Sequence, residues 1–101
     1  MGYTVKLGNG VCLDTHEIAM IVPPGLKFWF HRRRTETISG SEWVASEYYV
    51  YEVILKNGNK IESRGALDDI NKEHGLLSGL FLGLLTLHDF DKGMGFQRLL
   101  D

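Results

Sequence analysis

The sequence has a single cysteine, only two prolines and no long apolar run. Cys12 stands alone among 101 residues, which excludes an internal disulfide and every Cys–Cys zinc spacing. The longest apolar run, Leu76–Leu87, has 12 residues and is too short for a helix that crosses a bilayer. The opening residues alternate in polarity and include Lys6, so we expect no secretory signal. A small chain without disulfides relies on its core, and we expect a cytoplasmic protein with no membrane partner.

Signatures of catalysis and metal binding are also scarce. The chain has no His-Glu-x-x-His motif and no Gly-rich phosphate loop that follows a strand. His88, Asp89 and Asp91 lie close together, but three such residues in a turn are typical of solvated polar groups and helix caps. Asp68 and Asp69 are adjacent and point apart on a helix. We therefore expect a protein that is not an enzyme and that holds no metal and no cofactor.

The composition is that of an ordinary globular protein. Apolar residues make up 44% of the chain, charged residues make up 24%, and the formal net charge is −2. These values exclude a disordered or fibrous chain, and the length fits one domain over residues 1–101. The small negative charge excludes a protein that binds polyanions through its bulk charge.

Two stretches carry the same turn-forming pattern, Tyr-x-Val-x-Leu-x-Asn-Gly-x-x-(Leu/Ile). They begin at Tyr3 and Tyr51, which are 48 positions apart. Asn-Gly between alternating runs favours a tight β-hairpin, because both residues tolerate positive φ. The sequence therefore predicts two hairpins, with Cys12 opposite Leu7 as a small buried residue. The repetition fits either an internal duplication or two independent turns that use the same chemistry.

The region between these stretches predicts further strands. Residues 18–22 form a short apolar run, which we expect to be a buried strand that ends at Pro23-Pro24-Gly25. Residues 27–37 alternate as a strand does, and Ser39-Gly40-Ser41 supplies a turn. The return strand begins at Trp43 and runs toward Tyr51.

The period of the pattern changes after Gly65. Apolar residues at helical spacing predict a helix from about Ala66 that ends at Gly75, and the Leu-rich run over 76–87 predicts a second helix. The expected fold class is α+β: a mainly antiparallel sheet of about five strands, including the two Asn-Gly hairpins, followed by a Leu/Gly-rich helical C-terminus.

Part of the chain resembles a known family. The stretches Val5–Gly10, Leu13–Ile21 and Tyr51–Ile61 are similar to the FlbD family of small flagellar regulatory proteins. The resemblance covers about half of the chain, and residues 26–48 and the Leu/Gly-rich end have no counterpart in that family. It implies a small non-catalytic β module, and it assigns no functional residue.

The most distinctive feature is a basic and aromatic strand over residues 27–34. A period of two places Phe28 and Phe30 on one face and Trp29 on the other, with cations at the far end of both faces. Aromatic rings stack on bases, arginines pair with phosphates or carboxylates, and buried Trp and Arg dominate protein interfaces. A strand with a core end and a solvated end explains the same pattern. The candidate contact residues for a partner protein or a nucleic acid are Lys27, Trp29, His31, Arg32, Arg33, Arg34 and Trp43.

A second candidate surface lies in the Leu/Gly-rich run. Gly75, Gly79 and Gly83 recur every four residues and would line one face of a helix. Such a face suits close packing, either on the sheet or across a homodimer seam. The candidate self-association residues are Leu76, Gly79, Leu80, Gly83 and Leu84.

Two functions follow from these surfaces. The first is a small non-enzymatic interaction protein, a homodimer that regulates or inhibits a partner protein through the basic and aromatic hairpin. Compact chains of this kind are frequent among phage-encoded host-takeover and anti-defence proteins. The alternative is a module that binds a nucleic acid or a nucleotide with the same strand.

Overall fold

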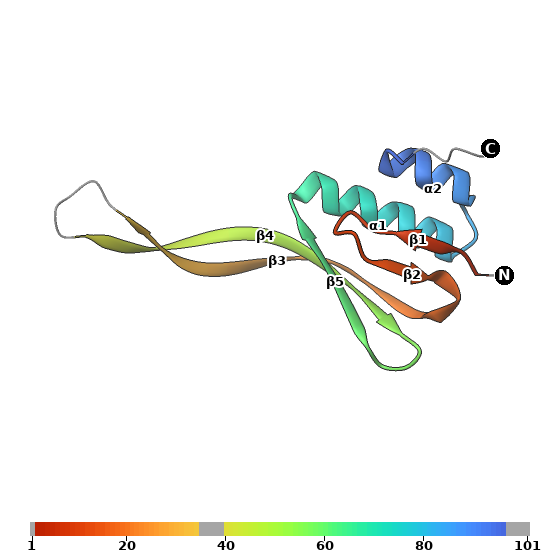
Figure 1. The fold of residues 1–101 in the computed structure, drawn as a ribbon, viewed down its shortest axis with the longest axis horizontal. Coiled ribbons are helices and arrows are strands. Elements are labelled where there is room, and N and C mark those ends of the chain that lie inside the picture. The colour runs from red at the N-terminus through yellow and green to blue at the C-terminus, as the bar shows by residue number, and fades with distance from the viewer. Residues whose placement is uncertain (1, 35–39, 97–101) are drawn as a thin grey trace.

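The computed structural model describes residues 2–34 and 40–96. The described chain has the predicted α+β class, with two antiparallel sheets followed by two helices (Figure 1). The principal-axis extents are 60 × 32 × 18 Å, and the long dimension comes from a two-stranded ribbon that projects away from the helices. Residues 35–37 of the predicted strand, and Ser39 of the predicted turn, lie outside the described residues.

The first sheet is a short hairpin made of β1 (Thr4–Lys6) and β2 (Cys12–Asp14). Val5 lies opposite Leu13, and both side chains are buried. The N–H of Leu7 donates to the carbonyl of Val11, so Leu7 lies outside the ladder. The prediction for Cys12 was wrong on both counts: it pairs with Lys6 and its side chain is exposed.

The second sheet contains β3 (Ile18–Arg34), β4 (Ser41–Leu55) and β5 (Lys60–Gly65) in the order β3-β4-β5. A one-turn 3-10 helix over Thr15–Glu17 leads into β3. The prediction that Pro23-Pro24 ends a strand was wrong, because β3 continues through both prolines with a register shift between Val22 and Gly25. The reason is the position of β3 at the edge of the sheet, where a residue without an N–H is tolerated at a bulge.

The helices differ from the prediction at their ends. Helix α1 (Leu67–Phe81) passes through Gly75, so that glycine does not end the helix. Packing of the following turn on the core outweighs the cost of about 1 kcal/mol for an interior glycine. The predicted helix over 76–87 is also wrong: α1 ends at Phe81 and α2 (Leu87–Met94) begins after a turn that contains Gly83 at φ +76°. Within residues 2–34 and 40–96, no helix is long and apolar enough to cross a membrane.

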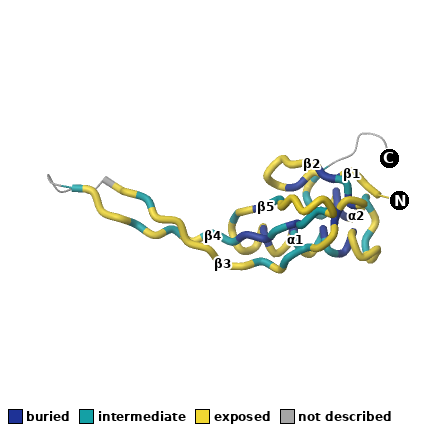
Figure 2. Tube along the Cα trace, turned by 90° about the horizontal axis from the view of Figure 1, so that it is seen from below, coloured by how far each residue is buried: buried dark blue, intermediate teal, exposed yellow. Residues whose placement is uncertain are grey.

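One core joins the two sheets and both helices. Its buried residues come from every part of the globular end: Val5, Leu7, Leu13, Ile18, Tyr51, Val53, Ile70, Leu77, Leu80 and Phe90. Figure 2 shows buried positions only at that end of the molecule, whereas the projecting ribbon is mainly exposed. The core therefore supports one end of a long hairpin, and no other described segment covers the far end.

Candidate docking arm

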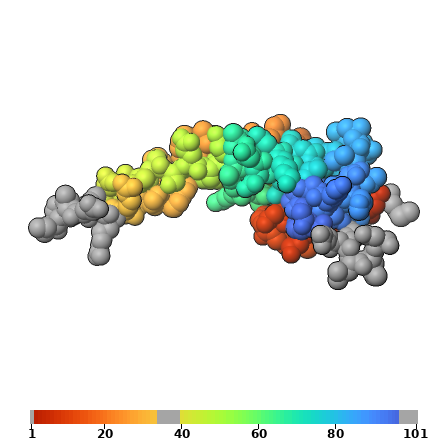
Figure 3. Space-filling model, turned by 90° about the horizontal axis from the view of Figure 1, so that it is seen from above, coloured from red at the N-terminus to blue at the C-terminus, as the bar shows by residue number. Residues whose placement is uncertain are grey.

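The projecting ribbon, which we call the arm, consists of residues 26–34 of β3 and 41–49 of β4. Strand β5 ends at Gly65, opposite Tyr49, and no other described strand pairs with β3 or β4 farther out. The described part of the arm is therefore two strands wide. It forms a narrow extension of the molecule (Figures 1 and 3). Its strands cross over one another in Figure 1, as expected from the strong twist of two-stranded ribbons. Among the described residues, no third strand and no helix pairs with the outer part of the arm.

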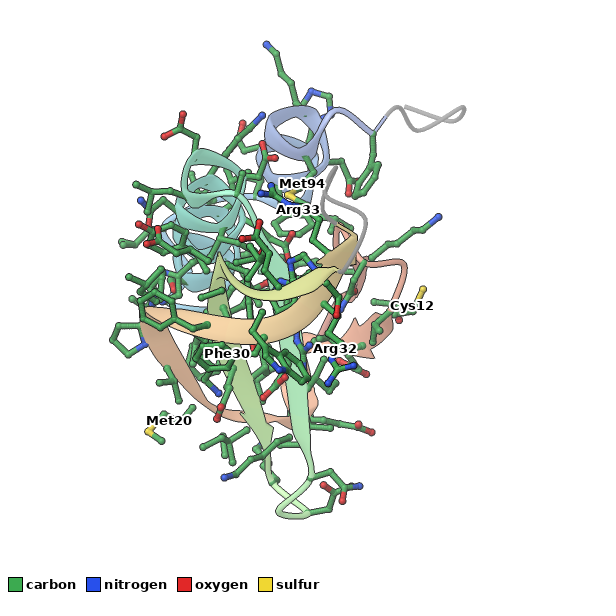
Figure 4. All side chains as sticks on the ribbon, turned by 90° about the vertical axis from the view of Figure 1, so that its left-hand side faces the viewer. Cys12, Met20, Phe30, Arg32, Arg33 and Met94 are labelled. Carbon is green, nitrogen blue, oxygen red and sulfur yellow. The ribbon has the colours of Figure 1, made fainter. Side chains whose placement is uncertain are left out.

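The register divides the arm into two chemically different faces. Directly opposite residues of antiparallel strands point to the same side, and neighbours along a strand alternate. Figure 4 shows Phe30 and Arg32 on one side of β3 and Arg33 on the other. We call the first the apolar face; it contains Leu26, Phe28, Phe30, Arg32, Trp43, Ala45, Glu47 and Tyr49. We call the second the ion-paired face; it contains Lys27, Trp29, His31, Arg33, Glu42, Val44, Ser46 and Tyr48.

The apolar face exposes large aromatic side chains. Phe28 is 54% exposed, Phe30 is 69% exposed and Trp43 is 65% exposed. Together these three residues expose roughly 400 Å² to water. The guanidinium of Arg32 lies over the Trp43 ring, 5.0 Å from its centroid. Continuous apolar patches of a few hundred Å² mark interaction sites in soluble proteins, and a cation beside such a patch adds selectivity for an acidic rim.

The ion-paired face neutralises its own cations. An oxygen of the Glu42 carboxylate lies 2.6 Å from a nitrogen of the Arg33 guanidinium. The Lys27 ammonium lies 3.9 Å from the Glu52 carboxylate and 3.8 Å from the Glu62 carboxylate. A hydrogen bond from Arg64, assisted by the charge of Lys27, lowers the pKa of the Glu62 carboxyl. Each of these cations therefore already has a carboxylate partner.

The same face has an aromatic hollow at the base of the arm. A pocket of about 370 Å³ is lined by Trp29, Tyr48, Arg64 and Gly65. The Arg64 guanidinium lies 5.2 Å from the centre of the Tyr48 ring. Trp29 stacks on His31 with 4.1 Å between ring centroids, and Nε2 of His31 lies 2.8 Å from the Ser46 hydroxyl. The hollow offers flat rings for a planar group, with one arginine at its edge.

The residues predicted from the sequence as contacts lie on both faces. Lys27, Trp29, His31 and Arg33 belong to the ion-paired face, whereas Arg32 and Trp43 belong to the apolar face. Arg34 pairs with Ser41 through the backbone, and its side chain lies outside the part of the chain that the structure describes. Four further residues contribute that the sequence prediction did not select: Phe28, Phe30, Tyr48 and Arg64. The sequence already placed Phe28 and Phe30 on one face of a strand, but it did not show whether other segments cover that face.

The candidate self-association residues do not form one surface. Gly79 and Leu80 are buried, and Leu76 packs partly against the core. Gly83 lies in the turn after α1, so the predicted face of three glycines on one helix is wrong. Leu84 alone of the set exposes a large apolar side chain, at 76%. The exposed apolar side chain of this set therefore lies in the α1–α2 turn and not on a helix face.

A buried polar cluster lies beneath α1. The Tyr51 hydroxyl donates to Oε1 of Glu73 at 2.5 Å, and the N–H of Gly8 donates to Oε2 of the same carboxylate at 3.1 Å. The ring of His74 lies edge-on to Tyr51, with 5.5 Å between the centroids. The arrangement joins β4, the loop after β1 and α1. Among the described residues, no group of three or more His, Cys, Asp or Glu side chains is placed to hold a metal ion.

His74 predicts a pH dependence of stability. Burial lowers its pKa in the folded protein, so the unfolded chain binds more protons below about pH 6.5. The free energy of unfolding therefore carries no penalty from His74 near pH 8, and it decreases as the pH falls below about 6.5 and the unfolded chain takes up the proton first. Urea unfolding at pH 7.5 and 5.5 measures the loss, and a His74→Gln variant, which cannot titrate, is expected to lose less between the two values. Equal losses in the two proteins would contradict the assignment.

Comparisons with known proteins return no relative. No protein-family model, no curated protein and no solved structure matches this chain. The similarity to the FlbD family therefore stays a prediction from the sequence.

Proposed function

We propose that this chain is a small non-enzymatic interaction protein that docks on a partner protein through the apolar face of its arm. The carrying observation is that Phe28, Phe30 and Trp43 are each more than half exposed on an element that reaches well beyond the core. Exposing these rings costs stability through lost apolar burial, and docking on a partner recovers it. By covering a surface of its partner, the chain acts as a regulator or inhibitor.

Charge supports a protein partner of a particular kind. The arm, residues 26–34 and 41–49, has one lysine, three arginines and two glutamates, so its formal charge is +2. Arg32, which stacks on Trp43, is the cation of the apolar face. The matching partner is an apolar surface with a carboxylate at its rim, because an arginine beside a hydrophobic patch recognises that combination.

A nucleic acid or nucleotide is the second candidate, supported by the pocket beside Trp29 and Tyr48. Aromatic rings of this kind stack on bases, and Arg64 lies at the edge of the pocket. The ion pairs of Lys27, Arg33 and Arg64 with glutamates weigh against it. A phosphate backbone would have to displace these carboxylates before it gained the counterion release that drives binding.

An oligonucleotide titration separates the two candidates. We expect fluorescence anisotropy with single- and double-stranded oligonucleotides to show weak binding at low salt and no saturation at physiological salt. One variant replaces Arg32, Arg33 and Arg34 together with alanine, and a second, Tyr48→Ala, removes a ring of the pocket. Saturable binding at physiological salt that either variant loses would contradict the protein-docking function and favour the nucleic-acid one.

The docking function also predicts which variants lose a partner. The measurement is quantitative affinity capture from an extract of the organism's own cells, with the original chain and each variant as bait. Phe30→Ser and Trp43→Ala are each expected to weaken binding of the partner that the original chain retains by about thirtyfold, which is the effect of losing one interface anchor. The matched control is Leu84→Ser, which removes an equally exposed apolar side chain at the opposite end of the molecule. Circular dichroism checks that all three fold. Equal retention by all three variants would contradict docking through the apolar face.

A further inference from the structure

One edge of the arm is open. Strand β5 pairs with β4 over Tyr49–Ile54, and on that side no described strand continues along residues 41–48. The N–H of Leu55 donates toward β5, to Asn59, whereas the N–H of Lys56 donates to Glu17 on the other side. Backbone groups of a strand alternate between its two neighbours, and β4 pairs without a bulge from Ser41 to Val50. The N–H and C=O groups of Trp43, Ala45 and Glu47 therefore face the open edge.

The two edges of the arm are not equivalent. The β3 edge carries Pro23 and Pro24 at its base. Prolines on an edge strand are a common protection against pairing with another chain. The β4 edge over residues 42–48 contains no proline, and its charged residues are Glu42 and Glu47. The β4 edge therefore lacks the proline protection of the β3 edge and is the better suited of the two to accept another strand.

We infer that the β4 edges of two copies of this chain pair antiparallel about Ala45 and make a four-stranded ribbon. In this register Ala45 lies opposite Ala45 of the second copy, and Trp43 lies opposite Glu47 of the second copy. The symmetry repeats each contact, as a two-fold interface requires. This pairing does not depend on the proposed docking function. The inference goes beyond that function because it names a second copy of the chain as the neighbour of β4.

Charge favours this register of β4 and disfavours the equivalent pairing of β3. Around Ala45, the Glu47 carboxylate lies beside the Arg32–Trp43 pair of the second copy, and no two carboxylates lie opposite one another. A β3–β3 pairing centred on Phe30 would instead place Lys27 opposite Arg33 of the second copy. Like charges directly opposite one another in a sheet are destabilising. The open edge and the charges thus select the same strand.

The pairing also enlarges the surface that the proposed function uses. Opposite residues share a face, so the Phe30–Ala45 rows of two copies join into one row of four residues with a phenylalanine at each end. Phe28 and Trp43 of both copies flank this row. The docking surface then has two-fold symmetry and twice the exposed aromatic area of one arm.

The test is sedimentation equilibrium of the full chain over a range from micromolar to millimolar concentration. We expect the mass to rise from 11.4 kDa toward twice that value with concentration. Ala45→Pro removes the N–H that faces the open edge and no N–H that bonds to β3, so we expect it to raise the dissociation constant by at least about tenfold while the β3–β4 pairing remains. Ala45→Ser keeps the N–H and is the matched control, which dimerises like the original chain. Circular dichroism confirms that each variant folds.

A second variant keeps the test independent of proline. Glu47→Lys places a cation beside Arg32 of the second copy, and it is also expected to weaken the dimer by about tenfold.

Three outcomes would overturn the inference. They are a monomer at every concentration, a dimer that Ala45→Pro leaves unchanged, and a dimer that Leu84→Ser abolishes. A monomer would leave the β4 edge open for a strand of a different protein. None of these outcomes decides the docking function, which depends on retention of a partner by the Phe30 and Trp43 variants.

Discussion

Replacing Phe90 with alanine is expected to lower the free energy of unfolding by about 4 kcal/mol. The Phe90 side chain is fully buried in the core and is the largest contribution of α2 to it. Its removal loses the transfer free energy of the ring and leaves a cavity that the neighbouring elements fill only in part. A chain of this size has a total stability of about 5 to 15 kcal/mol, so the variant would be close to unfolding. Urea unfolding followed by circular dichroism measures the loss.

Two companion variants distinguish loss of packing from loss of the helix. Phe90→Leu keeps most of the volume and is expected to cost about 1.5 kcal/mol. Thr86→Ala removes the capping box, in which the Thr86 hydroxyl and the Asp89 carboxylate bind each other's backbone N–H groups, and is expected to cost about 1 kcal/mol. A loss below 1 kcal/mol for Phe90→Ala would contradict the packing of α2 on this core.

Replacing Glu73 with alanine is the second change with a large expected effect, about 3 kcal/mol. Glu73 is buried in α1, and its two oxygens accept from Tyr51 and Gly8. Without the carboxylate, the partly buried N–H of Gly8 loses its acceptor, and the buried Tyr51 hydroxyl keeps only its hydrogen bond with Ser63. An unsatisfied buried group costs about 1 to 3 kcal/mol. Burial, followed by the hydrogen bond to Glu73, raises the pKa of Tyr51, so its hydroxyl stays protonated and donates at every physiological pH.

A double-mutant cycle isolates the hydrogen bond from the rest of the effect. Tyr51→Phe removes the donor and is expected to cost about 1.5 kcal/mol. The double variant Tyr51→Phe/Glu73→Ala is expected to be less destabilised than the sum of the single variants by at least about 1 kcal/mol. Additive effects would show that the two side chains do not interact in solution.

The same cluster explains a requirement for glycine. A Cβ added at Gly8 would lie 2.6 Å from Oε2 of Glu73, closer than a carbon and an oxygen can approach without a shift. The loop after β1 therefore approaches α1 closely because residue 8 has no side chain. This contact brings the short β1–β2 hairpin onto α1.

Local patterns in the sequence were sufficient for the fold class. The β-branched and aromatic residues over 41–55 and the leucines after Gly65 placed strands first and helices last, as the structure has them. The period of two also divided residues 27–34 into the two faces that the register shows. Both inferences depend on neighbours along the chain, and the backbone geometry of a strand or a helix is set at that range.

Local rules failed where a distant contact decided the outcome. Pro23-Pro24 predicts the end of a strand, but the edge position of β3 allows the strand to continue. Gly75 predicts the end of a helix, but packing of the next turn on the core extends α1 to Phe81. The spacing of Gly75, Gly79 and Gly83 predicts one helix face, but the chain turns before Gly83. A stretch of about ten residues does not determine where its strand lies in the sheet or which distant segments bury it.

The sequence by itself determined that residues 27–34 form a strand with aromatic rings and cations on both faces. It left open whether those rings belong to the core or to the surface. The tertiary structure decided this point, because β5 ends at Gly65 and α1 runs away from the arm (Figure 1). Within residues 2–34 and 40–96, no layer covers Phe28, Phe30 and Trp43. Whether an apolar side chain is buried depends on where other segments end, and that is a property of the assembled fold rather than of the strand.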